Sequence, residues 1–133
     1  MKKRIRPLVL IFLLFLSISC EREQEKLPTL ELKTGSGYTS DDAVISKGSS
    51  LTVGIIATKE ENNLKAYNIS VSFDGAHTTN TIQDYTIPSD QNTHYDKDVS
   101  FTVRNQMGTE KYYFTILDVD GNIVQKMLTF AVE

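Results

Sequence analysis

Residues 67–73 read Tyr67-Asn68-Ile69-Ser70-Val71-Ser72-Phe73, with apolar and polar side chains in strict alternation. In a β-strand successive side chains point to opposite faces, so this period of two places every apolar residue of the stretch on one face. An amphipathic helix needs a 3.6-residue repeat, which the stretch lacks. Asp74-Gly75 follows directly and is typical of a turn. We therefore predict a half-buried strand that ends at Phe73.

The same alternation recurs on both sides of this strand. It predicts further strands in the stretches 30–33, 51–57, 99–104, 112–117 and 123–132. Residues 78–87 are rich in threonine and β-prone, but Pro88 and the run Ser89–Asn92 interrupt them, so we expect an edge strand followed by a loop. His94–Asp98 is polar, and we expect it to be a solvated loop that leads into the strand at Val99.

Turn signals separate these strands at regular intervals. Asp120-Gly121-Asn122 lies between two alternating runs and favours a hairpin, because the turns preferred in hairpins need positive φ angles. About seven short strands within residues 28–133 is the pattern of an all-β protein built as an antiparallel, two-sheet β-sandwich. A closed barrel remains the alternative, since a period of two does not distinguish the two closures.

Residues 108–121 carry a resemblance to a known family. The run from Gly108 through Tyr112-Tyr113-Phe114 to Asp120-Gly121 resembles the penultimate strand and turn of immunoglobulin-like and PKD-like domains. The resemblance implies an immunoglobulin-like antiparallel β-sandwich of about seven strands, and a tyrosine-corner role for Tyr112, whose hydroxyl would hydrogen-bond to upstream backbone. The chain has one cysteine and no tryptophan, which excludes an antibody-type domain, so only the architecture carries over.

The N-terminus has the organisation of a bacterial export signal. A basic segment, Lys2 to Arg6, precedes nine apolar residues, Leu8–Leu16, which are too few to span about 30 Å of hydrocarbon at about 1.5 Å per helical residue. Ser17 and Ser19 then place small side chains before Cys20. This resembles the lipobox of bacterial lipoproteins, although that motif more often has Leu and then Ala or Gly where this chain has the two serines. The resemblance implies lipidation at Cys20. An ordinary secretory signal or a short uncleaved anchor is the alternative.

These features divide the chain into a lipoprotein signal peptide at residues 1–19, a lipid-anchored flexible tether at 20–27 and the domain at 28–133. Cys20 is the only cysteine and has no disulfide partner within the chain, which acylation would explain. The acidic run after Cys20 resembles the export signal of surface lipoproteins of Gram-negative gut anaerobes. We therefore expect an outer-membrane lipoprotein held to the membrane by its N-terminal lipid. It would be surface-exposed or periplasm-facing, and the acidic run favours the surface.

Charge and motifs narrow the function classes. Without the signal peptide the chain has 10 basic and 17 acidic residues, a net charge of −7, which repels phosphate backbones, so nucleic acid is not an expected partner. Asp118–Asn122 has the oxygen spacing of a calcium loop without the later ligands, so the hairpin explains it better. The spacing within His94–Asp98 matches no zinc site. We expect no cofactor and no metal.

Catalytic groups are few in this sequence. His77 and His94 are the only histidines, and no Gly-x-Ser-x-Gly motif occurs, so we do not expect an enzyme. An enzyme would need a concave pocket that joins His94 to at least two carboxylates.

Loop tyrosines are the candidate ligand contacts. Tyr38, Tyr85 and Tyr95 are expected in or near loops, where their amphipathic rings suit contact with a glycan or a protein; the alternative is that they cover sheet edges. The expected function is a non-enzymatic binding module that contacts another envelope protein or a glycan. The alternative is a structural accessory or spacer subunit of an outer-membrane assembly with no ligand of its own.

Overall fold

The computed structural model describes residues 24–133, so the expected signal peptide, Cys20 and the first part of the expected tether lie outside the described residues. The described part contains eight strands, which are β1 Thr29–Leu32, β2 Ala43–Ile45, β3 Ser50–Thr58, β4 Leu64–Phe73, β5 Asn80–Thr86, β6 His94–Thr102, β7 Gly108–Asp118 and β8 Ile123–Val132. Within residues 24–133, no helix has the length and apolar character needed to cross a membrane.

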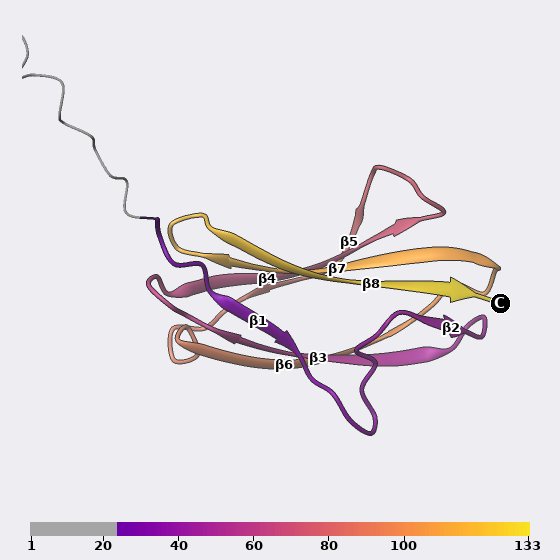
Figure 1. Cartoon of the computed structure of the whole chain (residues 1–133), viewed down its shortest axis with the longest axis horizontal. Coiled ribbons are helices and arrows are strands. Elements are labelled where there is room, and N and C mark those ends of the chain that lie inside the picture. The colour runs from indigo at the N-terminus through magenta and orange to yellow at the C-terminus, as the bar shows by residue number, and fades with distance from the viewer. Residues whose placement is uncertain (1–23) are drawn as a thin grey trace, which may run out of the picture.

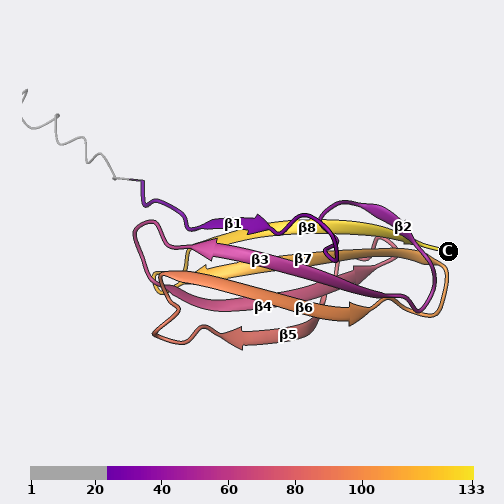
Figure 2. The ribbon, with the colours of Figure 1, turned by 90° about the horizontal axis from the view of Figure 1, so that it is seen from below.

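The strands form two sheets packed face to face, one with the order β1-β3-β6 and the other with the order β2-β8-β7-β4-β5. Figure 1 shows the sheets as two layers, with β3 and β6 facing β4, β7 and β8, and Figure 2 shows the strands running along a common long axis. Two separate sheets with free edges make a sandwich and exclude the barrel. Apart from β2 and β5, the order corresponds to the immunoglobulin arrangement: β1, β3 and β6 take the places of strands A, B and E, and β4, β7 and β8 take those of C, F and G. Strand D of that fold has no counterpart within residues 24–133.

The core lies between the sheets and follows the alternation of the sequence. Tyr67, Ile69 and Val71 of β4 are at most 3% exposed, and β7 buries Tyr112, Phe114 and Ile116 in the same way. Aromatic contacts around Tyr112 of β7 link neighbouring strands in the core: its ring lies 4.4 Å from that of Phe101 in β6 and 5.7 Å from that of Phe130 in β8. Such pairs add about 0.5 to 1.5 kcal/mol each beyond the area they bury.

The N-terminal part of the domain contributes to both sheets. β1 pairs antiparallel with β3, whereas β2 pairs parallel with the end of β8, from Ala43↔Phe130 to Ile45↔Val132. Where β2 begins, the carboxylate of Asp42 accepts a hydrogen bond of 2.7 Å from the backbone N–H of Thr129 and so satisfies the edge of β8. The sequence did not predict β2, because three residues are too few to display a period.

Of three expectations for the chain between residues 74 and 98, two are confirmed and one is wrong. The turn at Asp74-Gly75 is confirmed, and both residues have positive φ angles, 53° and 76°. The edge strand expected within 78–87 is also confirmed, because β5 is the last strand of its sheet. The solvated loop expected at His94–Asp98 is wrong: β6 starts at His94 and pairs with β3 without interruption from His94↔Thr58 to Thr102↔Ser50. Asp96 and Asp98 lie on the outer face of the sheet, where charge is tolerated, whereas Lys97 shares the inward face with Tyr95 and is half-buried, with its ammonium 4.8 Å from the ring of Tyr85.

Candidate functional site

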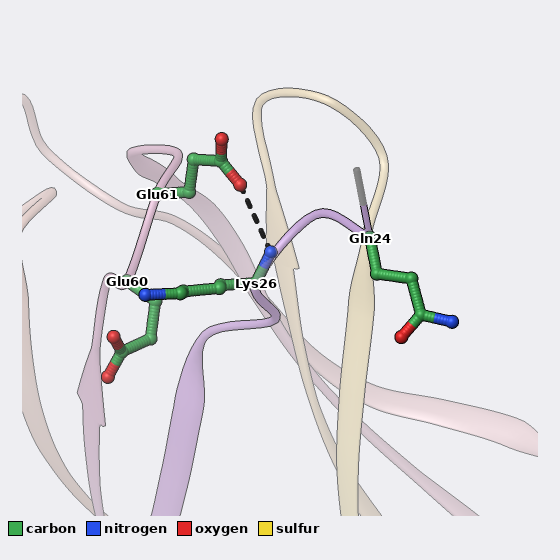
Figure 3. A pocket seen from close by; sticks show the side chains of 4 residues that line it. All are labelled: Gln24, Lys26, Glu60 and Glu61. Atoms are coloured by element: carbon green, nitrogen blue, oxygen red, sulfur yellow. Dashed lines mark hydrogen bonds between the residues drawn. The ribbon is translucent and has the colours of Figure 1, made fainter. Parts of the chain in front are cut away.

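The two ends of the sandwich differ, because the N-terminal segment enters at one of them. The backbone N–H of Lys26 donates a hydrogen bond of 3.0 Å to Glu61 in the β3–β4 loop, and Asn122 of the β7–β8 turn donates one of 2.8 Å to Glu25. Figure 3 shows the Lys26 side chain extending toward Glu60 while Gln24 points the other way. These residues line a shallow depression of about 360 Å³. This end, the tether end, is therefore occupied by the entering chain.

A second depression lies at the opposite, distal end, on the outer face of the larger sheet. Its volume is about 260 Å³, and it lies between the β4–β5 loop and the paired ends of β7 and β8, which Figure 1 places near the C-terminus. It is lined by Ser72, Gly75, Ala76, His77, Thr109, Lys111, Tyr113 and Thr129. Hydroxyl groups, two nitrogen bases and one aromatic ring are the kinds of side chain that bind polar ligands.

A third depression, of about 550 Å³, adjoins the second one. It shares Thr109 and Thr129 with it and continues over β8 to β2, where Asp42, Ala43, Val44 and Ala131 complete its lining. Val44 is 64% exposed, so this part of the surface is open and partly apolar. We call the two depressions together the distal groove. It crosses the outer face of the sheet from the β4–β5 loop to β2.

A buried ion-pair network braces the distal end beneath the groove. Glu110 is fully buried and accepts hydrogen bonds from the backbone N–H and the Nε of Arg104, both 2.9 Å, and from the hydroxyl of Tyr112 at 2.6 Å. The guanidinium of Arg104 also pairs with Asp74 at 3.2 Å and lies 4.0 Å from the ring of Phe73. The backbone N–H of Thr109 and then Arg104 hold the pKa of Asp74 below its usual value. The network joins the ends of β4, β6 and β7.

The predicted role of Tyr112 is therefore corrected. Its position in the penultimate strand is as the resemblance implies, but its hydroxyl donates to the side chain of Glu110 and not to upstream backbone. Burial, together with this hydrogen bond to a carboxylate, raises the pKa of Tyr112. No local pattern predicts that the acidic residue two positions away, Glu110, is buried.

Tyr38 lies in the loop between β1 and β2, as expected, over the outer face of the smaller sheet. Its hydroxyl donates a hydrogen bond of 2.9 Å to Asp98, and Lys33 pairs with Asp98 at 2.7 Å and also with Asp96. Hydrogen bonds from Lys33 and then Tyr38 lower the pKa of Asp98. Since the polar groups of this cluster bind one another, its geometry fits a clasp that holds the loop on the sheet.

Gly54 of β3 provides the space for that clasp. A Cβ atom at this position would lie 2.6 Å from Cδ of Lys33, 2.7 Å from Oδ1 of Asp98 and 2.8 Å from Cε1 of Tyr38. These separations are shorter than van der Waals contact, so the three side chains cross the strand only because it has no side chain there.

The other two predicted tyrosines lie elsewhere. Tyr95 is 4% exposed in β6 and packs edge to face against Tyr67, so the expectation that it lies in a loop and meets a ligand is corrected. Tyr85, in β5, is half-buried and stacks on Tyr67 with 5.8 Å between the ring centroids, beside the ammonium of Lys97. The structure thus brings Tyr85 and Tyr95 together through the core, and Tyr38 lies apart from them. Ligand contact by Tyr38 or Tyr85 remains a prediction.

Tyr113 is the aromatic residue of the distal groove, and sequence reasoning did not single it out. It follows Tyr112 in β7, and neighbouring residues of a strand face opposite sides, so one of the two rings had to lie on the outer face. Its ring lies 5.6 Å from the ammonium of Lys111, and its hydroxyl lies 3.4 Å from that of Ser72. The alternation of β7 therefore indicated an exposed ring at Tyr113, but the candidate ligand contacts were selected among tyrosines expected in or near loops.

The residues considered for metal or catalysis are dispersed over the surface. Within residues 24–133, no three His, Cys, Asp or Glu side chains are grouped so that they could hold a metal ion. His94 lies on the outer face of β6, with Nδ1 at 3.3 Å from the hydroxyl of Thr58, and it lines none of the three depressions. Asp118 binds the backbone N–H groups of Asp120 and Asn122 and so builds the predicted hairpin turn, which is confirmed.

Comparisons with known proteins agree with the fold. No protein-family model matches the chain, and no curated protein is significantly similar in sequence. The structure is similar to a chitin-binding domain from Burkholderia pseudomallei, with a TM-score of 0.52 and 10% identity, over 71% of this chain and 58% of that one. It is also similar to a family 123 glycoside hydrolase from Clostridium perfringens, with a TM-score of 0.51 and 6% identity, over 81% of this chain and 27% of that one. At such identities the likeness shows a shared β-sandwich fold.

Proposed function

We propose that this protein is a membrane-anchored lipoprotein whose immunoglobulin-like domain is a non-enzymatic binding module that contacts a glycan or another protein at the cell envelope. The observation that carries the proposal is the distal groove, which lies at the end of the sandwich farthest from the entering chain. A surface meant for an external partner is best placed there. Attachment would be through acylated Cys20, in the outer membrane, with the domain on the cell surface.

The lengths of the tether and of β7 support an orientation in which the distal groove faces away from the membrane. Four peptide steps separate Cys20 from Gln24, and at about 3.6 Å each they span at most about 14 Å. The tether end would thus lie close to the lipid surface. β7 contains 11 residues and runs from the distal end to the tether end, a length of about 35 Å at about 3.4 Å per residue. The groove would therefore stand well clear of the headgroups, and its long axis would lie across the exposed end of the domain.

Carbohydrate is the ligand class to test first. The groove offers hydroxyl groups and the ring of Tyr113, and rings with one apolar face and one polar end suit sugars. One of the solved structures that share the fold is described as a chitin-binding domain, which makes a glycan ligand compatible with this scaffold, although the fold alone does not specify one.

A binding experiment with a matched variant tests the module. The full-length lipoprotein, purified in detergent, would be applied to an array of microbial and host glycans. Tyr113→Ala should abolish the signals that the wild type gives, whereas Val119→Ala, which truncates an exposed apolar residue at the tether end, should leave them unchanged. Cross-linking of the wild type in intact cells would test for a protein partner in parallel. If the wild type captures neither a glycan nor an envelope protein, the spacer alternative is the better description of the protein.

Anchoring and orientation need separate measurements. Metabolic labelling with an alkyne fatty acid should label the wild type and not Cys20→Ala; a variant that still took up label would contradict lipidation at Cys20. Protease shaving of intact cells should remove the domain if it faces outward. Full protection in intact cells, with digestion after the outer membrane is opened, would place it in the periplasm instead.

A further inference from the structure

The pocket of the distal groove beside the β4–β5 loop carries positive charge without a matching carboxylate. Lys111 and His77 belong to its lining, and none of its lining residues is acidic. This is unusual for the molecule, since the chain after the signal peptide has a net charge of −7. Two carboxylates at the rim accept hydrogen bonds from the backbone of lining residues, Asp74 from Thr109 and Asp42 from Thr129. Acids that lie farther away than the Debye length, about 8 Å at physiological salt, are largely screened.

The ammonium of Lys111 has no ion-pair partner among residues 24–133. The four ion pairs of that region join Lys33 to Asp96 and Asp98, and Arg104 to Asp74 and Glu110. Asp74, at the tip of the neighbouring turn, already binds Arg104 and the backbone N–H of Thr109. Glu110 points into the core. Glu110, the neighbour of Lys111 in the chain, and Asp74, in the turn after the paired strand β4, are therefore occupied, and the charge of the lysine is left for a ligand.

The position of Lys111 next to an aromatic ring adds a second element of recognition. Lys111 and Tyr113 both project from the outer face of β7 and are both half-buried, so their side chains are partly fixed by the sheet. The hydroxyl groups of Thr109 and Thr129 lie on the same floor. A ligand that fits has a ring to place against Tyr113, hydroxyls to meet the threonines and an anionic group within reach of Lys111.

We propose that this pocket binds an acidic sugar residue, with its carboxylate or sulfate on Lys111 and His77 and its ring against Tyr113, and that the rest of the glycan continues along the groove toward β2. This assignment rests on the proposed binding function and names its ligand class. The volume of about 260 Å³ is at the lower limit of small-molecule pockets, so it holds one residue of a longer chain. The adjoining depression of about 550 Å³, lined partly by Ala43, Val44 and Ala131, receives the next residues.

The test compares ligands that differ only in charge. Binding of the full-length protein in detergent would be measured by calorimetry with an oligogalacturonate, with the same oligomer after reduction of its carboxyl groups to alcohols, with a sulfated galactan, and with an oligoglutamate peptide. The acidic glycans should bind at least about tenfold more tightly than the reduced oligomer, as expected for one charge-assisted contact. Their affinity should fall as salt rises, and that of the reduced oligomer should not.

Substitutions of Lys111 test whether its positive charge binds the acidic group of the ligand. Lys111→Gln should lose about tenfold in affinity for the acidic glycans and little for the reduced one, and Lys111→Arg should retain most of the affinity. Lys65→Gln, which removes the same charge from an exposed position near the tether end, is the control and should bind as the wild type does. Unchanged melting curves would show that each variant is folded.

The outcomes separate this inference from the function on which it rests. Equal binding of acidic and reduced oligomers, abolished by Tyr113→Ala, would overturn the acidic-sugar assignment and leave the glycan-binding function intact. Tighter binding of oligoglutamate than of any glycan, dependent on Lys111, would replace the glycan with an acidic peptide. No binding to any of the four probes would overturn the acidic-sugar assignment, and the glycan array would then decide separately whether the binding function holds.

Discussion

Glu110→Ala tests whether the buried network at the distal end stabilises the sandwich. The substitution removes the acceptor of three hydrogen bonds and leaves two donors without a partner in the interior, the hydroxyl of Tyr112 and the backbone N–H of Arg104. The guanidinium of Arg104 is partly exposed and keeps Asp74, so water replaces its lost contact at small cost. A buried donor without an acceptor costs about 1 to 3 kcal/mol, so the two donors together predict a loss of about 2 to 6 kcal/mol.

Thermal and urea unfolding would measure this loss. For a domain of this size, each kcal/mol corresponds to about 4 to 8 °C in Tm, so a decrease of at least about 8 °C is expected. Tyr112→Phe removes a single hydrogen bond and should cost less, about 1 to 2 kcal/mol. Glu31→Ala changes an exposed glutamate of β1 and should stay within about 0.5 kcal/mol of the wild type. A Glu110→Ala variant as stable as Glu31→Ala would refute the interpretation of the network as a stabilising brace.

Other perturbations give distinct results. Gly54→Ala forces apart the three side chains that cross it, so limited proteolysis should cut the loop at residues 33–42 sooner than in the wild type; unchanged digestion would count against the clasp. Tyr67→Phe removes a buried hydroxyl that has no hydrogen-bond partner among residues 24–133, and should raise the free energy of unfolding by up to about 1 to 2 kcal/mol. A clear loss of stability in urea unfolding would contradict this. Burial acts to raise the pKa of Asp118, but hydrogen bonds from Asn122 and Asp120 outweigh it and lower that pKa. The stability that ionised Asp118 contributes is therefore present above pH 4 and lost as the pH falls below it. In melting curves recorded over a pH series, the Tm of Asp118→Asn should fall less steeply at acid pH than that of the wild type. Burial raises the pKa of both Tyr67 and Tyr112, so the stability that these neutral tyrosines contribute to the fold is fully present below about pH 10 and lost above it. If the melting temperature stayed constant up to pH 12, these neutral tyrosines would not be part of the core.

Much of the fold could be predicted because the long strands pair antiparallel and each has one face toward the core and one toward solvent. Such a strand alternates apolar and polar residues, as Tyr67–Phe73 and Tyr112–Ile116 do, and the inward side chains of both runs are buried as expected. Prediction failed where a strand was too short to show a period, as at Ala43–Ile45, or where charges on the outer face resembled a loop, as at His94–Asp98. In the second case Tyr95 already alternated with its polar neighbours.

The candidate site was less predictable than the fold. The three candidate tyrosines were chosen because they were expected in or near loops. In the structure Tyr95 lies in the core, and the hydroxyl of Tyr38 donates a hydrogen bond to Asp98. The residues of the distal groove come from β2, β4, β7, β8 and the β4–β5 loop, which are separated by up to about two thirds of the chain. They are ordinary polar and small apolar residues of outer strand faces and loops, and no local pattern marks them.

By itself the sequence determined the all-β class, the inward faces of the strands, the hairpin turn at Asp118–Asn122 and the acidic character of the domain. These depend on local alternation, on turn residues and on composition, which act over a few residues. Only the tertiary structure decided that β2 pairs with β8, that Glu110 is buried with Arg104 and Tyr112, and that His77, Lys111 and Tyr113 line one pocket opposite the entering chain. Such juxtapositions depend on which strands become neighbours in a sheet, and that choice is made by the packing of the whole core.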